Sequence, residues 1–131
     1  MRVTVEYDAS CRAYVVRHEA VHLTSLEHID DWRRQLTEAL EVALGKRRAA
    51  LLIDIDGFEL DPHCASNYSE VAKAVMARFA THVIRFGKRG DLTTASIRTA
   101  AVKAKFASNI CDSRASAVAL LEALRHSELT R

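Results

Sequence analysis

Asp54 and Asp56 are the residues of this sequence best suited to catalysis, because they follow an apolar run and precede Gly57. Two carboxylates at this spacing can act as a nucleophile and as a general acid or base in phosphate transfer. That reaction also needs Mg²⁺, further carboxylates that hold the ion, and a cation that balances the phosphate. Lys88 could supply the cation, but no second acidic pair follows later in the chain. We therefore interpret Asp54 as a strand end and Asp56-Gly57 as a turn.

The same stretch resembles the Asp-x-Asp-Gly motif of haloacid-dehalogenase phosphatases, and a phosphatase that uses Asp54 and Asp56 is therefore kept as an alternative function. Phe58 stands where that family has Thr or Val, and the chain is too short to hold a cap domain. We expect no enzymatic activity and no cofactor.

The histidines near the N-terminus, His18, His22 and His28, raise the question of a metal site, because imidazole is a common metal ligand. They fall on a predicted strand, a turn and a helix start, and no thiolate or carboxylate completes a set with them. We interpret them as surface side chains and predict no metal ion. His63 lies in the first turn of a predicted helix, at the edge of the predicted sheet, and is a candidate contact residue.

The composition predicts one domain, residues 1–131, since the 131 residues are 49% apolar and can bury one core. The 19 Lys and Arg against 17 Asp and Glu leave a charge of +2, unlike the strongly basic surface of a nucleic-acid-binding protein. There is no apolar run of roughly 18 residues and no signal-peptide pattern, so we expect a cytoplasmic protein without an integral membrane segment. Isolated cysteines fit a reducing compartment, and we expect small buried side chains at Cys11, Cys64 and Cys111.

The spacing of apolar residues predicts the elements that position these side chains. Alternation from Met1 to Tyr7, followed by a β-rich run at 13–17, predicts an antiparallel hairpin. Helical spacing predicts a helix from Leu26 to Leu44, with Ser25 as its N-cap and Gly45 at its end. The nearly unbroken apolar run at 49–55 predicts a central strand that is covered on both faces.

Helices and strands alternate in the second half of the chain. Asp61 as N-cap and Pro62 as first helical residue predict a helix that reaches Phe79. The remaining predictions are a strand at 81–86, a turn at 87–91, a helix at 93–105, a weaker strand at 106–111 and a final helix after Ser113. The order β-β-α-β-α-β-α-β-α predicts an α/β fold with a single mixed, mainly parallel sheet flanked by helices.

This order and three stretches of sequence resemble the SpoIIAA-like branch of the STAS superfamily, also described as STAS/SEC14-like. The stretches are the turn at 20–23, the central run at 51–58 that leads into a helix, and the closing helix at 117–124. The resemblance implies a non-catalytic regulatory module that binds a protein partner. Its SEC14-like side implies, as an alternative, a small lipid-like or anionic ligand, and a homodimer is a further option.

The anti-sigma-antagonist members of that superfamily carry a phosphorylated serine in Asp-Ser-Ser-Gly, at the start of the helix after the central strand. The corresponding stretch here is Asp61-Pro62-His63-Cys64. Pro62 therefore replaces the acceptor, which argues against the phosphorylation switch in this chain. Ser66, one turn later, is the nearest hydroxyl, and we interpret it as an exposed polar side chain.

Ligands and partners of open α/β sheets meet the carboxyl ends of the parallel strands. We therefore expect the binding surface to combine the loop and helix after the central strand with the loop after the next strand. In this hypothesis Asp61 caps its helix, and Lys88 and Arg89 meet an anionic group. The predicted binding residues are Asp56, Asp61, His63, Ser66, Lys88, Arg89 and Asp91.

Overall fold

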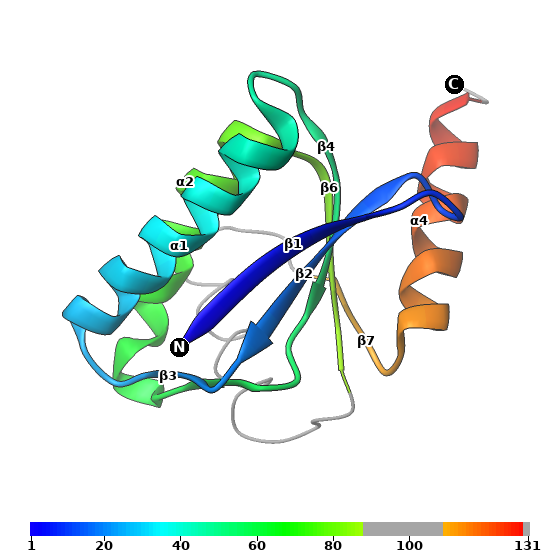
Figure 1. Cartoon of the computed structure of the whole chain (residues 1–131). Coiled ribbons are helices and arrows are strands. Elements are labelled where there is room, and N and C mark those ends of the chain that lie inside the picture. Colours follow the sequence, from blue (N-terminus) through cyan, green and yellow to red (C-terminus); the bar gives the residue numbers. More distant parts are fainter. Residues whose placement is uncertain (88–108, 130–131) are drawn as a thin grey trace.

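The main sheet of the computed structural model, which describes residues 1–87 and 109–129, has five strands in the order β1-β2-β4-β6-β7 (Figure 1). β1 pairs antiparallel with β2, whereas β2, β4, β6 and β7 run parallel to one another. The strands span Arg2–Asp8 (β1), Ala13–Glu19 (β2), Ala49–Asp54 (β4), Ala80–Phe86 (β6) and Asn109–Cys111 (β7). The hairpin, the central strand and the mixed sheet are confirmed.

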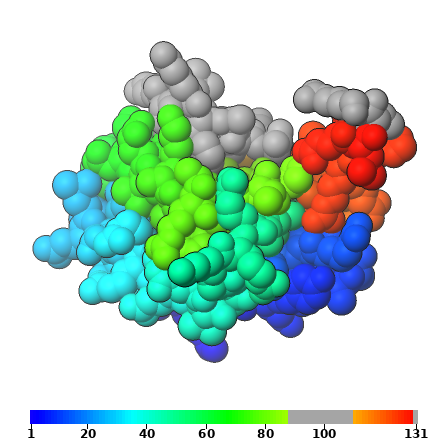
Figure 2. All heavy atoms as spheres, turned by 90° about the horizontal axis from the view of Figure 1, so that it is seen from above, coloured from blue at the N-terminus to red at the C-terminus, as the bar shows by residue number. Residues whose placement is uncertain are grey.

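Helices cover both faces of this sheet. α1 (Leu26–Leu44) and α2 (Ala65–Phe79) lie on one face, and α4 (Arg114–Leu129) lies on the other (Figures 1 and 2). Among the described residues, none of the helices combines the length and the apolar character that a membrane span needs. The helix predicted at 93–105 lies outside the described residues.

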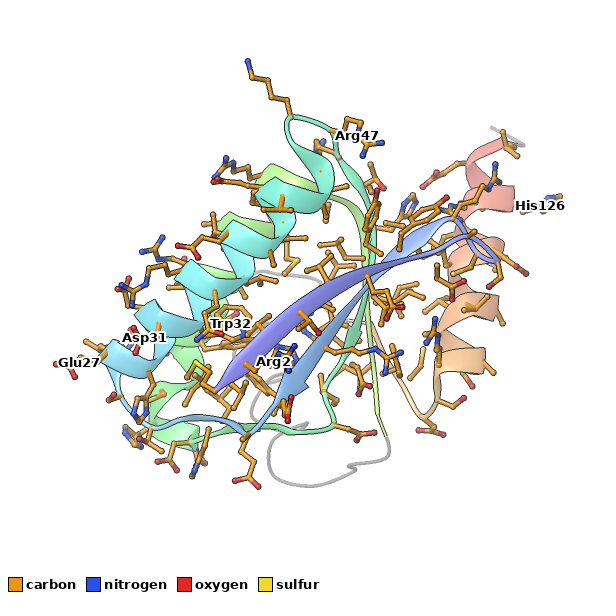
Figure 3. The ribbon with its side chains drawn as sticks, in the orientation of Figure 1. Arg2, Glu27, Asp31, Trp32, Arg47 and His126 are labelled. Carbon is orange, nitrogen blue, oxygen red and sulfur yellow. The ribbon has the colours of Figure 1, made fainter. Side chains whose placement is uncertain are left out.

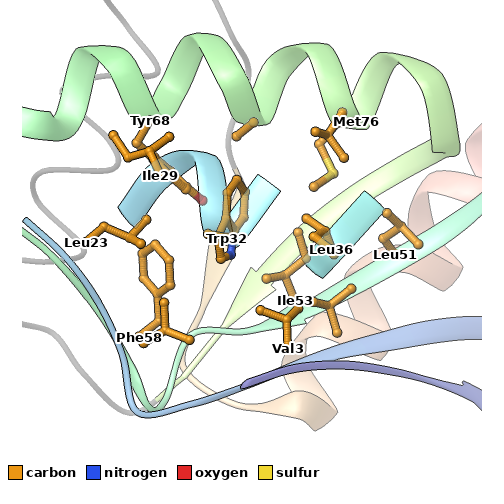
Figure 4. Close-up of a cluster of buried hydrophobic side chains, with 14 of the residues drawn as sticks. Val3, Leu23, Ile29, Trp32, Leu36, Leu51, Ile53, Phe58, Tyr68 and Met76 are labelled. Atoms are coloured by element: carbon orange, nitrogen blue, oxygen red, sulfur yellow. The ribbon is translucent and has the colours of Figure 1, made fainter. Parts of the chain in front are cut away.

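β4 shows why the sheet needs helices on both sides. Leu51 and Ile53 belong to the larger cluster of buried apolar side chains, under α1 and α2, whereas Ala50 and Leu52 belong to the cluster under α4. Successive side chains of a strand point to opposite faces, so an unbroken apolar run supplies both clusters. Figure 4 shows Leu51 and Ile53 beside the side chains of α1.

α1 begins and ends where the sequence predicts. The Ser25 hydroxyl accepts a hydrogen bond from the His28 N–H at 3.2 Å, and Gly45 ends the helix with a φ of 60°. Glu27 and Asp31 lie on the outer side of the helix (Figure 3). The opposite stripe is buried against the sheet and consists of Ile29, Trp32, Leu36, Leu40 and Leu44.

A second sheet of two strands was not predicted. β3 (Val21–Leu23) pairs in parallel with β5 (Phe58–Leu60), where the sequence had predicted a turn at 20–23. The small sheet follows directly on the turn at Gly57, whose carbonyl accepts from the Val21 N–H at 2.9 Å. Strands this short carry too few residues for alternation alone to identify them.

The predictions for the final helix and for the cysteines hold with one exception. The final helix starts at a serine cap, since Ser113 Oγ accepts from the Ser116 N–H at 3.1 Å. Cys11 and Cys64 are buried as expected, but Cys111 is only partly buried. Cys111 ends β7, which among the described residues has a neighbouring strand on one side only.

Candidate functional site

The parallel strands β4, β6 and β7 end at the same edge of the main sheet. Asp54 at the end of β4 is level with Phe86 at the end of β6, which is level with Cys111 at the end of β7. The chain beyond these ends stays tied together, since the Ile55 N–H donates to the Phe86 carbonyl at 2.9 Å and the Gly87 N–H donates to the Cys111 carbonyl at 3.2 Å. This carboxyl edge is the frame on which the candidate residues are arranged.

The acidic pair at this edge forms a tight turn, as predicted. Asp54 Oδ1 accepts from the backbone N–H of Asp56 at 2.9 Å, and burial raises the pKa of the half-buried Asp54. Gly57 follows with a φ of 79°, and a Cβ there would lie 2.5 Å from the carbonyl oxygen of His18. One Asp54 carboxylate oxygen is thus engaged in holding the backbone of the turn.

His18 is not the surface residue that the sequence predicted. It is 9% exposed and lies under the turn, with Nδ1 2.7 Å from the Asp54 carbonyl oxygen. Trp32 Nε1 donates to His18 Nε2 at 3.1 Å. Because an indole N–H can only donate, Nε2 is the acceptor and Nδ1 carries the proton that it donates to Asp54. Both ring nitrogens are therefore satisfied in the neutral imidazole.

The electrostatics agree with a neutral His18. Burial lowers the pKa of His18 to about 4, and the charge of Arg85 acts in the same direction, while the hydrogen bond to Asp54 opposes them. Aromatic rings enclose the imidazole, with the centroid of Phe58 at 4.9 Å and that of Trp32 at 6.4 Å (Figure 4 shows Trp32 and Phe58). This part of the carboxyl edge is a closed structural centre that joins β2, β4 and α1.

The start of α2 lies at the far end of β5 from this turn and is built differently. A 3-10 turn at Pro62–Cys64 precedes the α-helix, which begins at Ala65. Asp61 occupies the N-cap position, but its side chain accepts no capping hydrogen bond, contrary to the prediction. One of the two N–H groups that a capping side chain can bind, that of Cys64, donates instead to the Asp61 carbonyl at 2.9 Å.

His63 is exposed at this point and is held by two neighbours. His63 Nε2 lies 3.2 Å from the Thr24 carbonyl oxygen, and Nδ1 lies 3.7 Å from Asp61 Oδ2. A second pair lies on the small sheet, where His22 Nδ1 is 3.8 Å from Glu59 Oε2. Each histidine therefore lies beside a carboxylate, and each pair is partly open to solvent.

We call these residues together with the first turn of α2 the α2-entry surface. It consists of His22, Thr24, Glu59, Asp61, His63 and Ser66. Of the predicted binding residues, Asp61 and His63 lie side by side in the structure, and Ser66 is exposed in the first turn of α2.

Asp56 lies apart from this surface, because it is at the other end of β5, where a Cβ on Gly87 would be 3.0 Å from Asp56 Oδ1. Lys88, Arg89 and Asp91 lie outside the described residues. Among the residues that are described, there is no group of three or more His, Cys, Asp or Glu side chains that could hold a metal ion.

His22, Glu59 and Thr24 were missed as candidate contact residues. The signal was present, because His22 and Glu59 are each the polar centre of an apolar-polar-apolar triplet, and the outer residues of both triplets are buried. Two such triplets pair only if the chain brings them together. That pairing is a tertiary property which no local pattern contains.

Comparisons with known proteins identify the fold. No family model matches the sequence, and no curated protein matches it. Among solved structures, the chain is similar to an anti-sigma-factor antagonist (STAS) domain protein from Planctomyces limnophilus, with 12% sequence identity and a TM-score of 0.63. The match covers 93% of this chain and 99% of that protein. The chain therefore has the fold of a STAS domain, as its sequence resemblance predicted.

Proposed function

We propose that this chain is a non-catalytic regulatory module that binds a partner protein through the α2-entry surface. The observation that carries the proposal is the convergence of two exposed histidine-carboxylate pairs, from β3, β5 and the start of α2, on one part of the molecule. The solved structure of the same fold is named as an anti-sigma-factor antagonist (STAS) domain protein, and this name supports a regulatory role.

The chemistry of the surface favours a polar partner. The first turn of α2 carries no acidic side chain, and Asp61 does not cap it, so the helix dipole favours an acidic group from a partner. Glu59 and Asp61 in turn can accept from basic or amide side chains. His63 and Ser66 are exposed between the start of α2 and these carboxylates, and we expect both side chains to contact the partner.

The absence of catalysis is part of the proposal. In the described part of the chain, Asp54 is the carboxylate best placed for chemistry, yet one of its oxygens holds the Asp56 backbone. We also propose that Pro62 abolishes the phosphorylation switch implied by the resemblance to STAS proteins, which leaves Ser66 as a contact residue.

Photo-crosslinking in the native cell tests the binding surface. A photoreactive phenylalanine analogue at Ser66 should give one dominant adduct, and the same analogue at exposed Glu122, on α4 across the sheet, should not. The combined change Glu59→Ala and His63→Ala should remove the Ser66 adduct. Equal labelling from both positions, or an adduct that survives the double change, would contradict the proposal.

An activity assay tests the catalytic alternative. We expect no hydrolysis of p-nitrophenyl phosphate in the presence of Mg²⁺, either by the native chain or by Asp54→Asn. Turnover by the native chain that disappears in Asp54→Asn would show that the acidic pair is a phosphatase site.

A further inference from the structure

We propose that the free edge of β1 pairs with the same edge of a second copy of this chain and forms a two-fold homodimer with Val5 opposite Val5. β1 ends the strand order of the main sheet, and among the described residues it pairs with β2 alone. The Val3 N–H faces this edge, where it donates to Gln35 Oε1 on α1 at 3.2 Å, and in the dimer it exchanges this acceptor for the Tyr7 carbonyl of the second copy. Alternate residues of an antiparallel strand share this direction, so Val5 and Tyr7 also present backbone groups there.

The sequence of β1 is complementary to itself when two copies run antiparallel. Arg2 begins the strand, and Glu6 and Asp8 end it. Pairing centred on Val5 places Arg2 opposite Asp8 of the second copy and diagonal to its Glu6, whereas parallel pairing places like charges together. The Arg2 and Glu6 side chains are 71% and 73% exposed. Within one chain Arg2 lies 3.8 Å from Glu19, Glu6 lies 3.8 Å from Arg17, and Asp8 is bound by Arg114. The first two pairs are exposed and contribute little, so Arg2 and Glu6 can exchange these partners for each other across the dimer.

An apolar groove follows the same edge. It has a volume of about 560 Å³, lies between β1 and α1, and is lined in part by Val5, Ala39 and Val42 (Figure 1 shows β1 alongside α1). Val42 is 90% exposed, and Tyr7 further along the strand is 52% exposed. Joining the two β1 edges sets the grooves of the two copies against each other, which removes apolar side chains from water. A second copy therefore fits both the charge pattern and the apolar surface.

The β1 edge and the α2-entry surface share no residue. The dimer therefore goes beyond the proposed partner binding, and either proposal can fail while the other holds. An extended strand from another protein could also pair with this edge. Disulfide trapping between two copies of the chain separates that case from the homodimer.

Sedimentation equilibrium of the full chain over a range of concentrations tests the dimer. We expect a concentration-dependent dimer whose dissociation constant rises at least about tenfold in Val42→Lys and in Arg2→Glu. Leu129→Lys changes an 85% exposed apolar residue at the end of α4 and should leave the dissociation constant unchanged. A chain that stays monomeric throughout, or a dimer that neither variant weakens, would overturn the proposal.

Disulfide trapping tests the register. In the proposed pairing, Thr4 lies opposite Glu6 of the second copy, in a non-hydrogen-bonded pair whose Cα atoms are about 4.5 Å apart, within disulfide range. A mixture of Thr4→Cys and Glu6→Cys chains should form a covalent dimer on oxidation. Each variant alone, and the native chain with its own cysteines, should not. Cross-linking by Thr4→Cys alone or Glu6→Cys alone would show a different register and refute the one proposed.

Discussion

His18 and His63 lie near opposite ends of the small β3–β5 sheet, and the two imidazoles have different roles. His18 is enclosed by aromatic rings and has a hydrogen-bonding partner at each nitrogen. His63 is exposed, touches a backbone carbonyl with one nitrogen and lies near a carboxylate with the other. The first arrangement stabilises the fold, and the second leaves polar atoms open to a partner. Burial and hydrogen-bonding partners, rather than residue type, therefore distinguish structural from functional polar groups here.

Truncation of the two histidines should give the largest contrast. His18→Ala leaves a cavity and two unpaired buried groups, the Trp32 N–H and the Asp54 carbonyl, and should lower the free energy of unfolding by about 4 kcal/mol. His63→Ala should change it by less than about 0.5 kcal/mol, because the side chain is exposed. Urea unfolding followed by Trp32 fluorescence measures both. Similar losses of unfolding free energy in the two variants would show that His18 is no more important for the fold than His63.

The turn above His18 offers a second contrast, between two glycines. Gly57→Ala introduces a Cβ 2.5 Å from the His18 carbonyl oxygen at a φ of 79°, and we expect a loss of about 3 kcal/mol. Gly45 also has a positive φ, but a Cβ there meets nothing within 4 Å, so Gly45→Ala should cost less, about 2 kcal/mol from the strained backbone alone. Thermal unfolding of both variants checks the order. A larger loss at Gly45 would mean that the turn is looser than described.

The pH dependence of stability should report His18. Its pKa falls from 6.5 to about 4 on folding, so between these values the unfolded chain binds a proton that the folded chain does not. Stability should therefore decrease as the pH falls from about 6.5 to about 4, by up to about 3 kcal/mol. The lowered pKa of Asp8, about 2 against 3.8, acts below this range.

The difference between the native chain and His18→Gln isolates the contribution of His18, since the carboxylates are common to both. The difference in unfolding free energy should depend on pH only between the two pKa values. A difference that is flat from pH 4 to 6.5 would contradict the buried, neutral His18.

Removal of the indole donor should have a smaller effect. Trp32→Phe keeps most of the ring packing but leaves His18 Nε2 without a donor, and we expect a loss of about 2 kcal/mol. Unfolding monitored by circular dichroism measures the change, since the tryptophan signal is gone. An unchanged stability would show that the hydrogen bond contributes nothing to the fold.

The sequence predicted the long elements because their patterns are local. The run at 49–55 has the length and apolar character of a strand covered on both faces, and the stripe from Ile29 to Leu44 has the spacing of one face of a helix. β3 and β5 escaped because each has three residues and is stabilised by the other, far away in the sequence.

The site was predicted in part for the same reason. Asp61 and His63 are neighbours in sequence, so their proximity was accessible, as was the turn at Asp56. Alternation with the exposed Arg17 and Glu19 places His18 on the opposite face of β2, but the groups that pair its two nitrogens come from α1 and β4, and no local pattern contains them. The capping prediction for Asp61 failed, and the chain forms a 3-10 turn there in which the Cys64 N–H donates to the Asp61 carbonyl.

The most direct test of the proposed function is an amide NMR spectrum of the ¹⁵N-labelled chain, recorded with and without the protein captured through Ser66. We expect the largest shifts at the amides of Glu59, His63 and Ser66. The signal of the Trp32 indole N–H, which donates to His18, should stay in place. Shifts centred on the Trp32 indole and the turn at Asp56, with the start of α2 unchanged, would contradict the proposed function.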